Sequence, residues 1–184
     1  MITWRETRLR LRADRARLIE AWQARPGSVP IALWLTPSYQ CVLLHRVSFF
    51  FNARGNRLLA RLFWHLNLLA TGCDIAPISD VGGGLVVHFP LAIGLIGTVG
   101  RNCTIEGHCG IGGGTRRRAD IGAGPGLPVI GDDVVLGWGA LVMGPVHIGN
   151  RVVVGHGAVV TTDVPDCAVV PDRDLVLLHR RSGT

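Results

Sequence analysis

Lysine is absent from this sequence, because all 19 basic residues are arginine. We attribute that bias to a GC-rich genome, so it excludes no function by itself. A Cys-x-x-Cys pair is also missing, and the five cysteines form an odd set. This pattern favours a reduced intracellular compartment over a disulfide framework. The 25 glycines lack the strict triplet of collagen, so some other fold must need glycine repeatedly.

Long hydrophobic runs are lacking too. The runs Cys41–Phe51 and Leu58–Ala70 are too short to span a bilayer and are interrupted or flanked by arginines such as Arg46 and Arg61. They predict amphipathic helices that pack on the rest of the protein, with membrane-surface binding as the alternative that we do not favour. The N-terminus is charged and the first apolar run begins only near Val29. We therefore expect no secretory leader and a cytoplasmic location.

Positive charge is concentrated at the start of the chain, where seven arginines lie between Arg5 and Arg25. Such a basic end can bind nucleic acid or an anionic membrane. Neither interleaved aromatic residues nor a nucleic-acid-binding motif accompanies it, so we interpret it as a solvated helix face and expect no nucleic-acid partner.

A repeat of six residues dominates the rest of the sequence. Aliphatic residues recur at thirteen of thirteen positions, with one interruption after Ile111. They are Ile75, Val81, Val87, Ile93, Val99, Ile105, Ile111, Ile130, Leu136, Val142, Ile148, Val154 and Val160. A period of six excludes both a helix face and a simple alternating strand. It indicates short strands joined by tight turns.

A second set of residues, nearly all small or apolar, follows four positions after each aliphatic residue. It comprises Ser79, Leu85, Leu91, Gly97, Cys103, Cys109, Thr115, Val134, Ala140, Val146, Val152, Ala158 and Val164. We expect one residue of each set to point inward from every strand, and three hexads to close one triangular coil of a solenoid. The expected division is a helical segment over 1–71, a β-helix over 72–170 and a tail over 171–184.

The interruption lies at 116–129 and adds thirteen residues to the expected spacing of six, since 130 minus 111 is 19. Its polar, Gly/Pro-rich sequence predicts a loop that leaves the coil. Arg116, Arg117 and Arg118 open this loop. These arginines either keep the loop solvated or bind an anionic group of a substrate.

The repeat resembles that of the hexapeptide-repeat acyltransferases. Three further stretches are similar to the serine acetyltransferase branch, namely TGCDIAP at 71–77, NCTIEGHCGIGGG at 102–114 and PVIGDDVVLGWGALVMGPVHIG at 128–149. The resemblance implies a mainly β fold, a left-handed parallel β-helix preceded by helices. It also implies acetyl-CoA as co-substrate, a small-molecule acceptor, no metal, and a homotrimer with active sites between subunits.

The same resemblance implies a catalytic pair, with His88 as general base and Asp74 as the carboxylate that orients it. His88 lies one residue after Val87, whereas the family's histidine lies two residues after the inward aliphatic. Either the turn slips by one residue, which we favour, or the catalytic histidine has been lost and Phe89 stands in its place. His108 is the second choice for the base.

For acetyl-CoA the resemblance implies a groove lined by Gly112, Gly113, Trp138, Gly139, His156, Gly157 and Arg173. Trp138 and His156 are 18 residues apart, one full coil, so they should stack. They are bulkier than the groove residues of the family. Leu127 replaces the family's loop histidine, which removes one partner for an amino-acid carboxylate. We therefore expect free serine to be a poorer acceptor than in the family.

Three functions from different classes remain open. The first is an acetyl-CoA-dependent O-acetyltransferase acting on serine or a serine-like hydroxyl compound. The second is a catalytically degenerate paralogue that serves as a trimeric partner or regulatory subunit. The third, a metal enzyme like the β-helix carbonic anhydrases, needs three histidines across an interface and has the least support.

Overall fold

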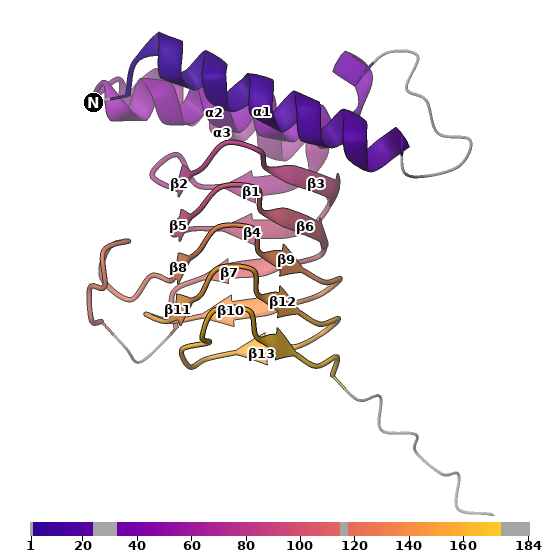
Figure 1. The fold of residues 1–184 in the computed structure, drawn as a ribbon. Helices are drawn as coiled ribbons and strands as arrows, with labels where there is room; N and C mark the ends of the chain where they lie inside the picture. Colours follow the sequence, from indigo (N-terminus) through magenta and orange to yellow (C-terminus); the bar gives the residue numbers. More distant parts are fainter. Residues whose placement is uncertain (1, 24–32, 115–117, 174–184) are drawn as a thin grey trace, which may run out of the picture.

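The computed structural model describes residues 2–23, 33–114 and 118–173. The N-terminal part consists of α1 (Trp4–Gln23), a short 3₁₀ helix η1 (Leu33–Leu35), α2 (Pro37–Ala53) and α3 (Arg57–Thr71). These helices form a layer across one end of a β-solenoid (Figure 1). The two apolar runs of the sequence are therefore helices, as expected. Within the described residues, no helix is long and apolar enough to cross a membrane.

Local sequence signals set the ends of α2 and α3. Thr36 caps α2 by accepting a hydrogen bond from the Tyr39 amide at 3.3 Å, and a proline follows at the first helical position. Asn56 caps α3 in the same way through the Leu59 amide at 3.1 Å. Gly72 ends α3 with a φ of 71°, a left-handed conformation that glycine adopts without strain. The first strand therefore begins immediately after α3.

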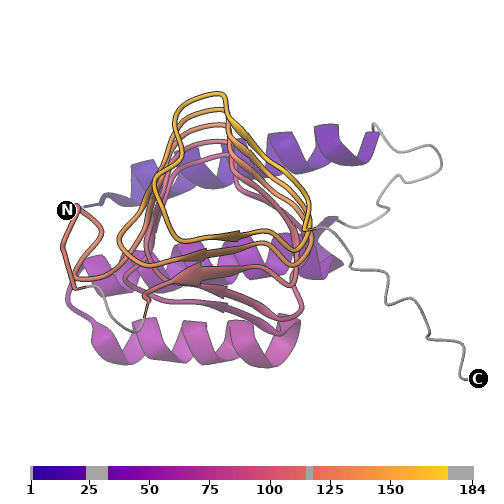
Figure 2. The same cartoon turned by 90° about the horizontal axis from the view of Figure 1, so that it is seen from below.

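Within the described residues, fourteen short strands build the solenoid. They are β1 (Cys73–Ile75), β2 (Asp80–Val81), β3 (Val86–Phe89), β4 (Ile93–Leu95), β5 (Thr98–Val99), β6 (Thr104–Gly107), β7 (Gly110–Gly112), β8 (Val129–Ile130), β9 (Val135–Leu136), β10 (Leu141–Met143), β11 (His147–Ile148), β12 (Val153–Val154), β13 (Val159–Val160) and β14 (Val169–Val170). They pair in parallel in three sheets. Seen along the axis, successive coils superimpose as a triangle (Figure 2). The predicted parallel β-helix with N-terminal helices is confirmed.

The sheets follow the three sides of the triangle. Sheet A has the order β1-β4-β7-β10-β13, sheet B the order β11-β8-β5-β2 and sheet C the order β14-β12-β9-β6-β3. Val81 pairs with Val99, eighteen residues later (99 minus 81), which is three hexads per coil. All thirteen repeated aliphatic residues are buried. Cys41 and Val42 of α2 join the same core cluster, so α2 closes the end of the solenoid.

The hexad register breaks between β3 and β4, and this corrects the expected inward place of Leu91. Leu91 was expected inside, but its side chain is 62% exposed. Ile93 is buried beside Cys73, and Leu95 takes the position above Ile75. The segment after β3 thus carries two extra residues, and the spacing from Leu95 to Val99 is correspondingly short. Pro90 lacks an amide hydrogen and cannot continue β3, which favours a wide turn at this point.

The buried cysteines are core residues. All five cysteines are free, and Cys103 and Cys109 face inward, as the hexad pattern predicted. Burial raises the pKa of the Cys103 thiol to about 12. This thiol therefore stays protonated and unreactive near neutral pH.

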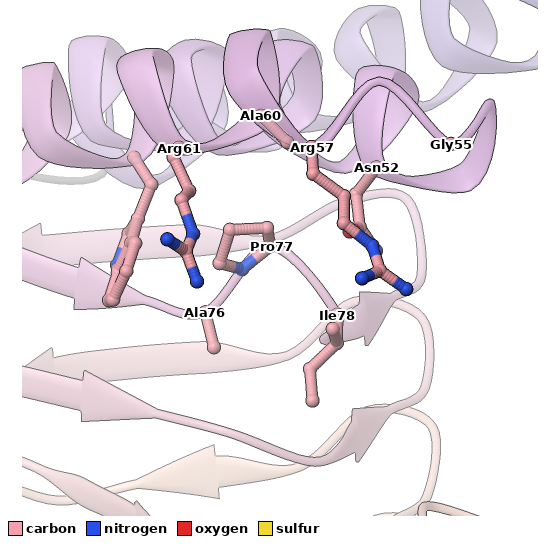
Figure 3. Close-up of a pocket in the computed structure, with 9 residues that line it drawn as sticks. Asn52, Gly55, Arg57, Ala60, Arg61, Ala76, Pro77 and Ile78 are labelled. Carbon is pink, nitrogen blue, oxygen red and sulfur yellow. The ribbon is translucent and has the colours of Figure 1, made fainter.

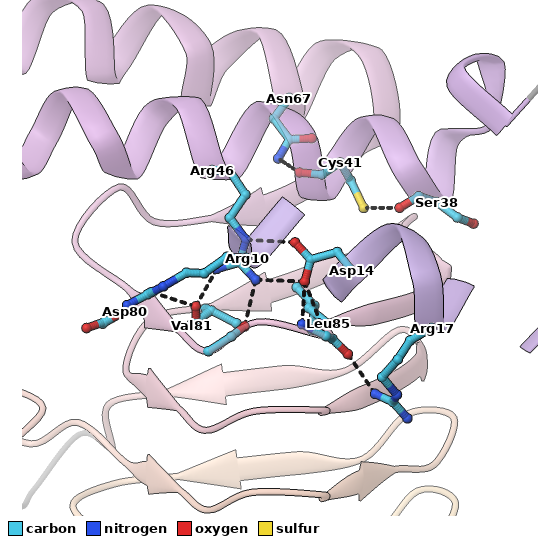
Figure 4. Close-up of polar contacts among 12 residues, drawn as sticks. Arg10, Asp14, Arg17, Ser38, Cys41, Arg46, Asn67, Asp80, Val81 and Leu85 are labelled. Atoms are coloured by element: carbon cyan, nitrogen blue, oxygen red, sulfur yellow. Dashed lines mark hydrogen bonds and ion pairs between the residues drawn. The ribbon is translucent and has the colours of Figure 1, made fainter. Parts of the chain in front are cut away.

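Helices α1 and α2 bind the first coil through a buried ion pair (Figure 4). Asp14 of α1 and Arg46 of α2 are each 1% exposed and lie 2.9 Å apart, Nε to Oδ2. Arg46 also donates to the carbonyls of Val81 and Gly82, while Asp14 Oδ1 accepts from the Gly84 and Leu85 amides. Every charged atom of the pair thus has a partner, which burial of a charge requires.

Two of the seven N-terminal arginines belong to this attachment. Arg10 donates to Asp80 and to the Val81 carbonyl, and Arg17 donates to the Gly84 carbonyl at 2.6 Å. The interpretation of the basic segment as a solvated helix face therefore holds for neighbours such as Arg8 and Arg12, which are exposed, but not for Arg10 and Arg17.

Candidate active site

A cavity of 480 Å³ lies on the outer face of sheet A, below α3. Its lining consists of Trp64, Asp74, Ala76, Gly94, Leu95, Ile96, Gly110, Ile111, Gly112, Gly113 and Met143. Gly94 and Gly110 stand side by side at outward positions of β4 and β7. Since glycine has no side chain, a ligand can approach the backbone of this sheet closely. The cavity is therefore shallow, apolar and bordered by one carboxylate.

That carboxylate belongs to Asp74, which is half-buried on β1. The indole Nε1 of Trp64 donates a hydrogen bond to Asp74 Oδ1 at 2.7 Å. Trp64 comes from α3 and is also half-buried. The short charge-assisted bond fixes the direction of the carboxylate at the edge of the cavity. Trp64 was missed by sequence reasoning, although an aromatic residue ten positions before the aspartate was a usable signal.

His88, the predicted base, lies on a different sheet from Asp74. It occupies β3 in sheet C, its side chain is half-buried, and its carbonyl accepts a hydrogen bond from Ser38 Oγ at 2.9 Å. Val87 pairs with Ile105 and Phe89 with Gly107, so β3 keeps the hexad register through Phe89. The expected one-residue slip at His88 is therefore wrong; the shift comes after Phe89 and measures two residues. The catalytic assignment of His88 stays a prediction.

Phe89 faces outward and is part of an aromatic cluster at the corner between sheets C and A. Its ring meets the Trp138 ring edge to face, with centroids 5.2 Å apart. The His108 imidazole lies 4.8 Å from the Trp138 ring on the same side of the solenoid. Gly107 lies between Phe89 and Trp138, where a Cβ atom would come within 2.7 Å of the indole. Only glycine at 107 allows this contact.

Trp138 and His156 lie one above the other, as their spacing predicted. His156 Nδ1 accepts a hydrogen bond from the Trp138 amide at 2.9 Å and lies 3.4 Å from Glu106 Oε2. Gly139 and Gly157 follow these residues with φ of 73° and 66°. Arg173 is exposed, and its amide donates to the His156 carbonyl at 2.9 Å. Glu106 was not singled out from the sequence.

The remaining predicted site residues divide between cavity and loop. Gly112 is buried and Gly113 is exposed, and both line the cavity beside Asp74. Arg118 is exposed, whereas Arg116 and Arg117 lie outside the described residues. In the parts of the chain that the structure describes, no group of three His, Cys, Asp or Glu residues is arranged to hold a metal ion.

Comparison with known proteins gives matches in sequence and in fold. Residues 128–162 match the family model described as bacterial transferase hexapeptide (six repeats). Serine acetyltransferase from Mycobacterium tuberculosis is 34% identical over 157 residues, which cover 83% of this chain and 66% of that protein. Serine acetyltransferase from Helicobacter pylori is 30% identical over 135 residues, covering 72% of this chain and 76% of that protein.

Solved structures agree with these matches. Soybean serine acetyltransferase complexed with serine superposes with a TM-score of 0.79 at 26% identity, covering 91% of this chain and 68% of that one.

A serine acetyltransferase from Synechococcus elongatus is 34% identical in sequence over 137 residues, and those residues cover 73% of this chain but only 54% of that relative. The chain thus spans about half to two thirds of the length of the two relatives that match at 34% identity.

Proposed function

The chain belongs to the serine acetyltransferase family of hexapeptide-repeat proteins, and we propose that it transfers an acetyl group from acetyl-CoA to the hydroxyl of serine or of a serine-like small molecule. The observation that carries this proposal is the 480 Å³ cavity, where the glycine-rich face of sheet A meets the oriented carboxylate of Asp74. A cavity with few polar groups on a rigid scaffold is the usual form of a small-molecule site.

The transfer requires a base, an orienting carboxylate and donors for an oxyanion. A neutral imidazole takes the proton of the acceptor hydroxyl while its oxygen attacks the thioester carbonyl. The tetrahedral oxyanion then collapses, the C–S bond breaks, and the imidazolium returns the proton to the departing thiolate. We assign the base to His88, with His108 as second choice. Trp64 bonds to Oδ1 of Asp74, and among the described contacts Oδ2 has no hydrogen-bond donor. Asp74 would therefore stabilise the imidazolium through Oδ2.

The proposed acetyl-CoA site combines two neighbouring regions. Gly112 and Gly113 lie in the cavity of sheet A, where backbone amides of a glycine-rich coil can serve the oxyanion. The second region lies at the corner between sheets C and A and contains Trp138, Gly139, His156, Gly157 and Arg173. We further propose a homotrimer, in which a neighbouring subunit completes each site.

A steady-state kinetic comparison of variants tests this assignment. In His88→Ala, kcat should fall by about 10²–10⁴, because the base is removed. Asp74→Asn should reduce kcat less, through a wrongly set tautomer. Acetyl-CoA consumption is measured with L-serine, L-homoserine, a sugar panel and no acceptor. Unchanged turnover in His88→Ala together with loss in His108→Ala would transfer the role to His108.

A second candidate function is a catalytically degenerate subunit. The observation in its favour is the unshifted register of β3, which places Phe89 at the outward position and packs the strand of His88 against α2. Under this alternative no acceptor of the panel is acetylated, yet the protein still assembles. Turnover above the no-acceptor rate that disappears in Asp74→Asn would rule the alternative out.

A further inference from the structure

A second cavity, of 590 Å³, lies between the start of α3 and the segment that follows β1. Arg57 and Arg61 extend from α3 toward Ala76, Pro77 and Ile78 of the first coil (Figure 3). Asn52 of α2 adds a neutral amide to the lining. No carboxylate lines this cavity, so its charge is entirely positive.

Arg57 and Arg61 are exposed to solvent, and no carboxylate in the lining of the cavity is paired with either guanidinium group. Neither makes a hydrogen bond or an ion pair with any residue in the described parts of the chain. They stand four residues apart on one helix face, an unfavourable spacing for like charges. Arg57 is also the first residue of α3, where the helix dipole disfavours cations and favours anions. An anion bound between them would relieve both effects.

Arg54 gives an internal comparison. It belongs to the same turn between α2 and α3, but its guanidinium lies over the Phe50 ring at 4.6 Å from the centroid. Arg54 is absent from the lining of the cavity. A cation–π contact therefore accounts for Arg54, whereas Arg57 and Arg61 remain unexplained by the contacts of the fold.

The second cavity adjoins the first one. Trp64 and Ala76 line both cavities, and the indole of Trp64 donates to Asp74 in the first. A molecule whose hydroxyl lies beside Asp74 can therefore extend past Trp64 toward the two arginines. An arginine pair binds compact oxyanions well, because each guanidinium presents parallel N–H donors.

We propose that Arg57 and Arg61 form an anion-binding subsite that holds a carboxylate or phosphate group of the acceptor. The part of this inference that concerns the acceptor rests on the proposed acetyltransferase function; the anion site itself does not. It also assigns the anionic end of the acceptor to α3 rather than to the loop that begins at Arg116. Arg57 and Arg61 contribute affinity and selectivity, and Asp74 remains with the reacting hydroxyl.

Direct binding tests the site without any catalysis. Inorganic phosphate and malonate are titrated separately by calorimetry into the full-length protein and into Arg57→Gln, Arg61→Gln and the matched control Arg54→Gln. Each cavity variant should weaken binding of the preferred anion about tenfold or more, and the control should stay within about twofold of wild type. Thermal melting in the absence of ligand verifies that the variants fold. Equal binding by all four proteins, or no binding by wild type, would overturn the inference.

Kinetics then separates the subsite from the proposed reaction. Small hydroxy compounds that carry a carboxylate, a phosphate or no charge are compared as acceptors. Arg61→Gln should raise KM for the charged acceptors about tenfold and leave KM for the neutral ones and kcat nearly unchanged. If the arginine variants lose anion binding and the wild-type protein shows no acetyl transfer, the subsite is upheld and the proposed function is contradicted. Acetyl transfer whose kinetics are unchanged in Arg57→Gln and Arg61→Gln would uphold the proposed function and contradict the role of the two arginines in binding the acceptor.

Discussion

At the scale of single residues, His45 is notable as a buried imidazole whose ring nitrogens lack hydrogen-bond partners among the described residues. It is 1% exposed on α2. Its ring packs 6.1 Å from that of Phe49. Burial, and secondarily the positive charges of Arg46 and Arg10, lower the pKa of His45 well below 6.5. The imidazole is therefore neutral in the folded protein.

This residue predicts an acid-dependent loss of stability. Below pH 6.5 the unfolded chain binds a proton at His45 that the folded chain does not, so the free energy of unfolding falls as the pH falls. The contribution of one such group is about 1.4 kcal/mol per pH unit. In His45→Leu, the contribution of this residue to the slope of the free energy of unfolding against pH should disappear. Urea unfolding between about pH 5 and pH 7.5 measures it.

The exposed His147 provides the control for that measurement. His147→Gln should keep the slope of the wild type, because it changes an exposed side chain and leaves the buried His45 in place. An unaltered slope in His45→Leu would mean that other groups cause the acid sensitivity.

At the scale of elements, one ion pair determines how the helical layer attaches to the solenoid. Removal of Arg46 leaves Asp14 buried without its counter-charge, which typically costs about 3–5 kcal/mol. Arg46→Met should therefore lower the free energy of unfolding by that amount in urea titrations. The pair between Arg101 and Asp132 is a matched control, since its side chains are 74% and 33% exposed. Arg101→Gln should cost no more than about 1 kcal/mol.

The double variant Asp14→Leu/Arg46→Met completes the experiment. It removes both charges and should recover part of the stability that Arg46→Met loses, because no unpaired carboxylate remains. The Gly84 and Leu85 amides then lose their acceptor, so recovery is expected to be incomplete. Equal effects of Arg46→Met and Arg101→Gln would contradict the role assigned to the buried pair.

At the scale of the whole molecule, exposed apolar side chains argue for assembly. Leu58, Leu62 and Leu69 of α3 are 80%, 52% and 84% exposed, and Val159 at the outer face of sheet A is 49% exposed. Exposed apolar side chains that gather on one element, as these leucines do on α3, are typical of interfaces in soluble proteins. Sedimentation equilibrium should therefore give a mass about three times the 19.8 kDa of one chain. A monomer at micromolar concentration would contradict the proposed trimer.

Much of the fold was readable from the sequence because its signal is periodic and local. An aliphatic residue every six positions determines which side chain points inward, and the same pattern recurs in each coil. The thirteen aliphatics, the inward Cys103 and Cys109, and the stacking of Trp138 on His156 all follow from this period. The family motif also singled out Asp74, which lines the cavity of sheet A, while its catalytic role stays a prediction.

Only the tertiary structure decided what depends on contacts between distant segments. The two-residue shift before β4 appears in the pairing of strands, because Ile93 satisfies the hexad pattern in either register. Trp64 bonded to Asp74, the pair Asp14–Arg46, and the cavity of Arg57 and Arg61 each join helices to the first coil. No repeat encodes such contacts, since they form only where the helical layer packs on the end of the solenoid.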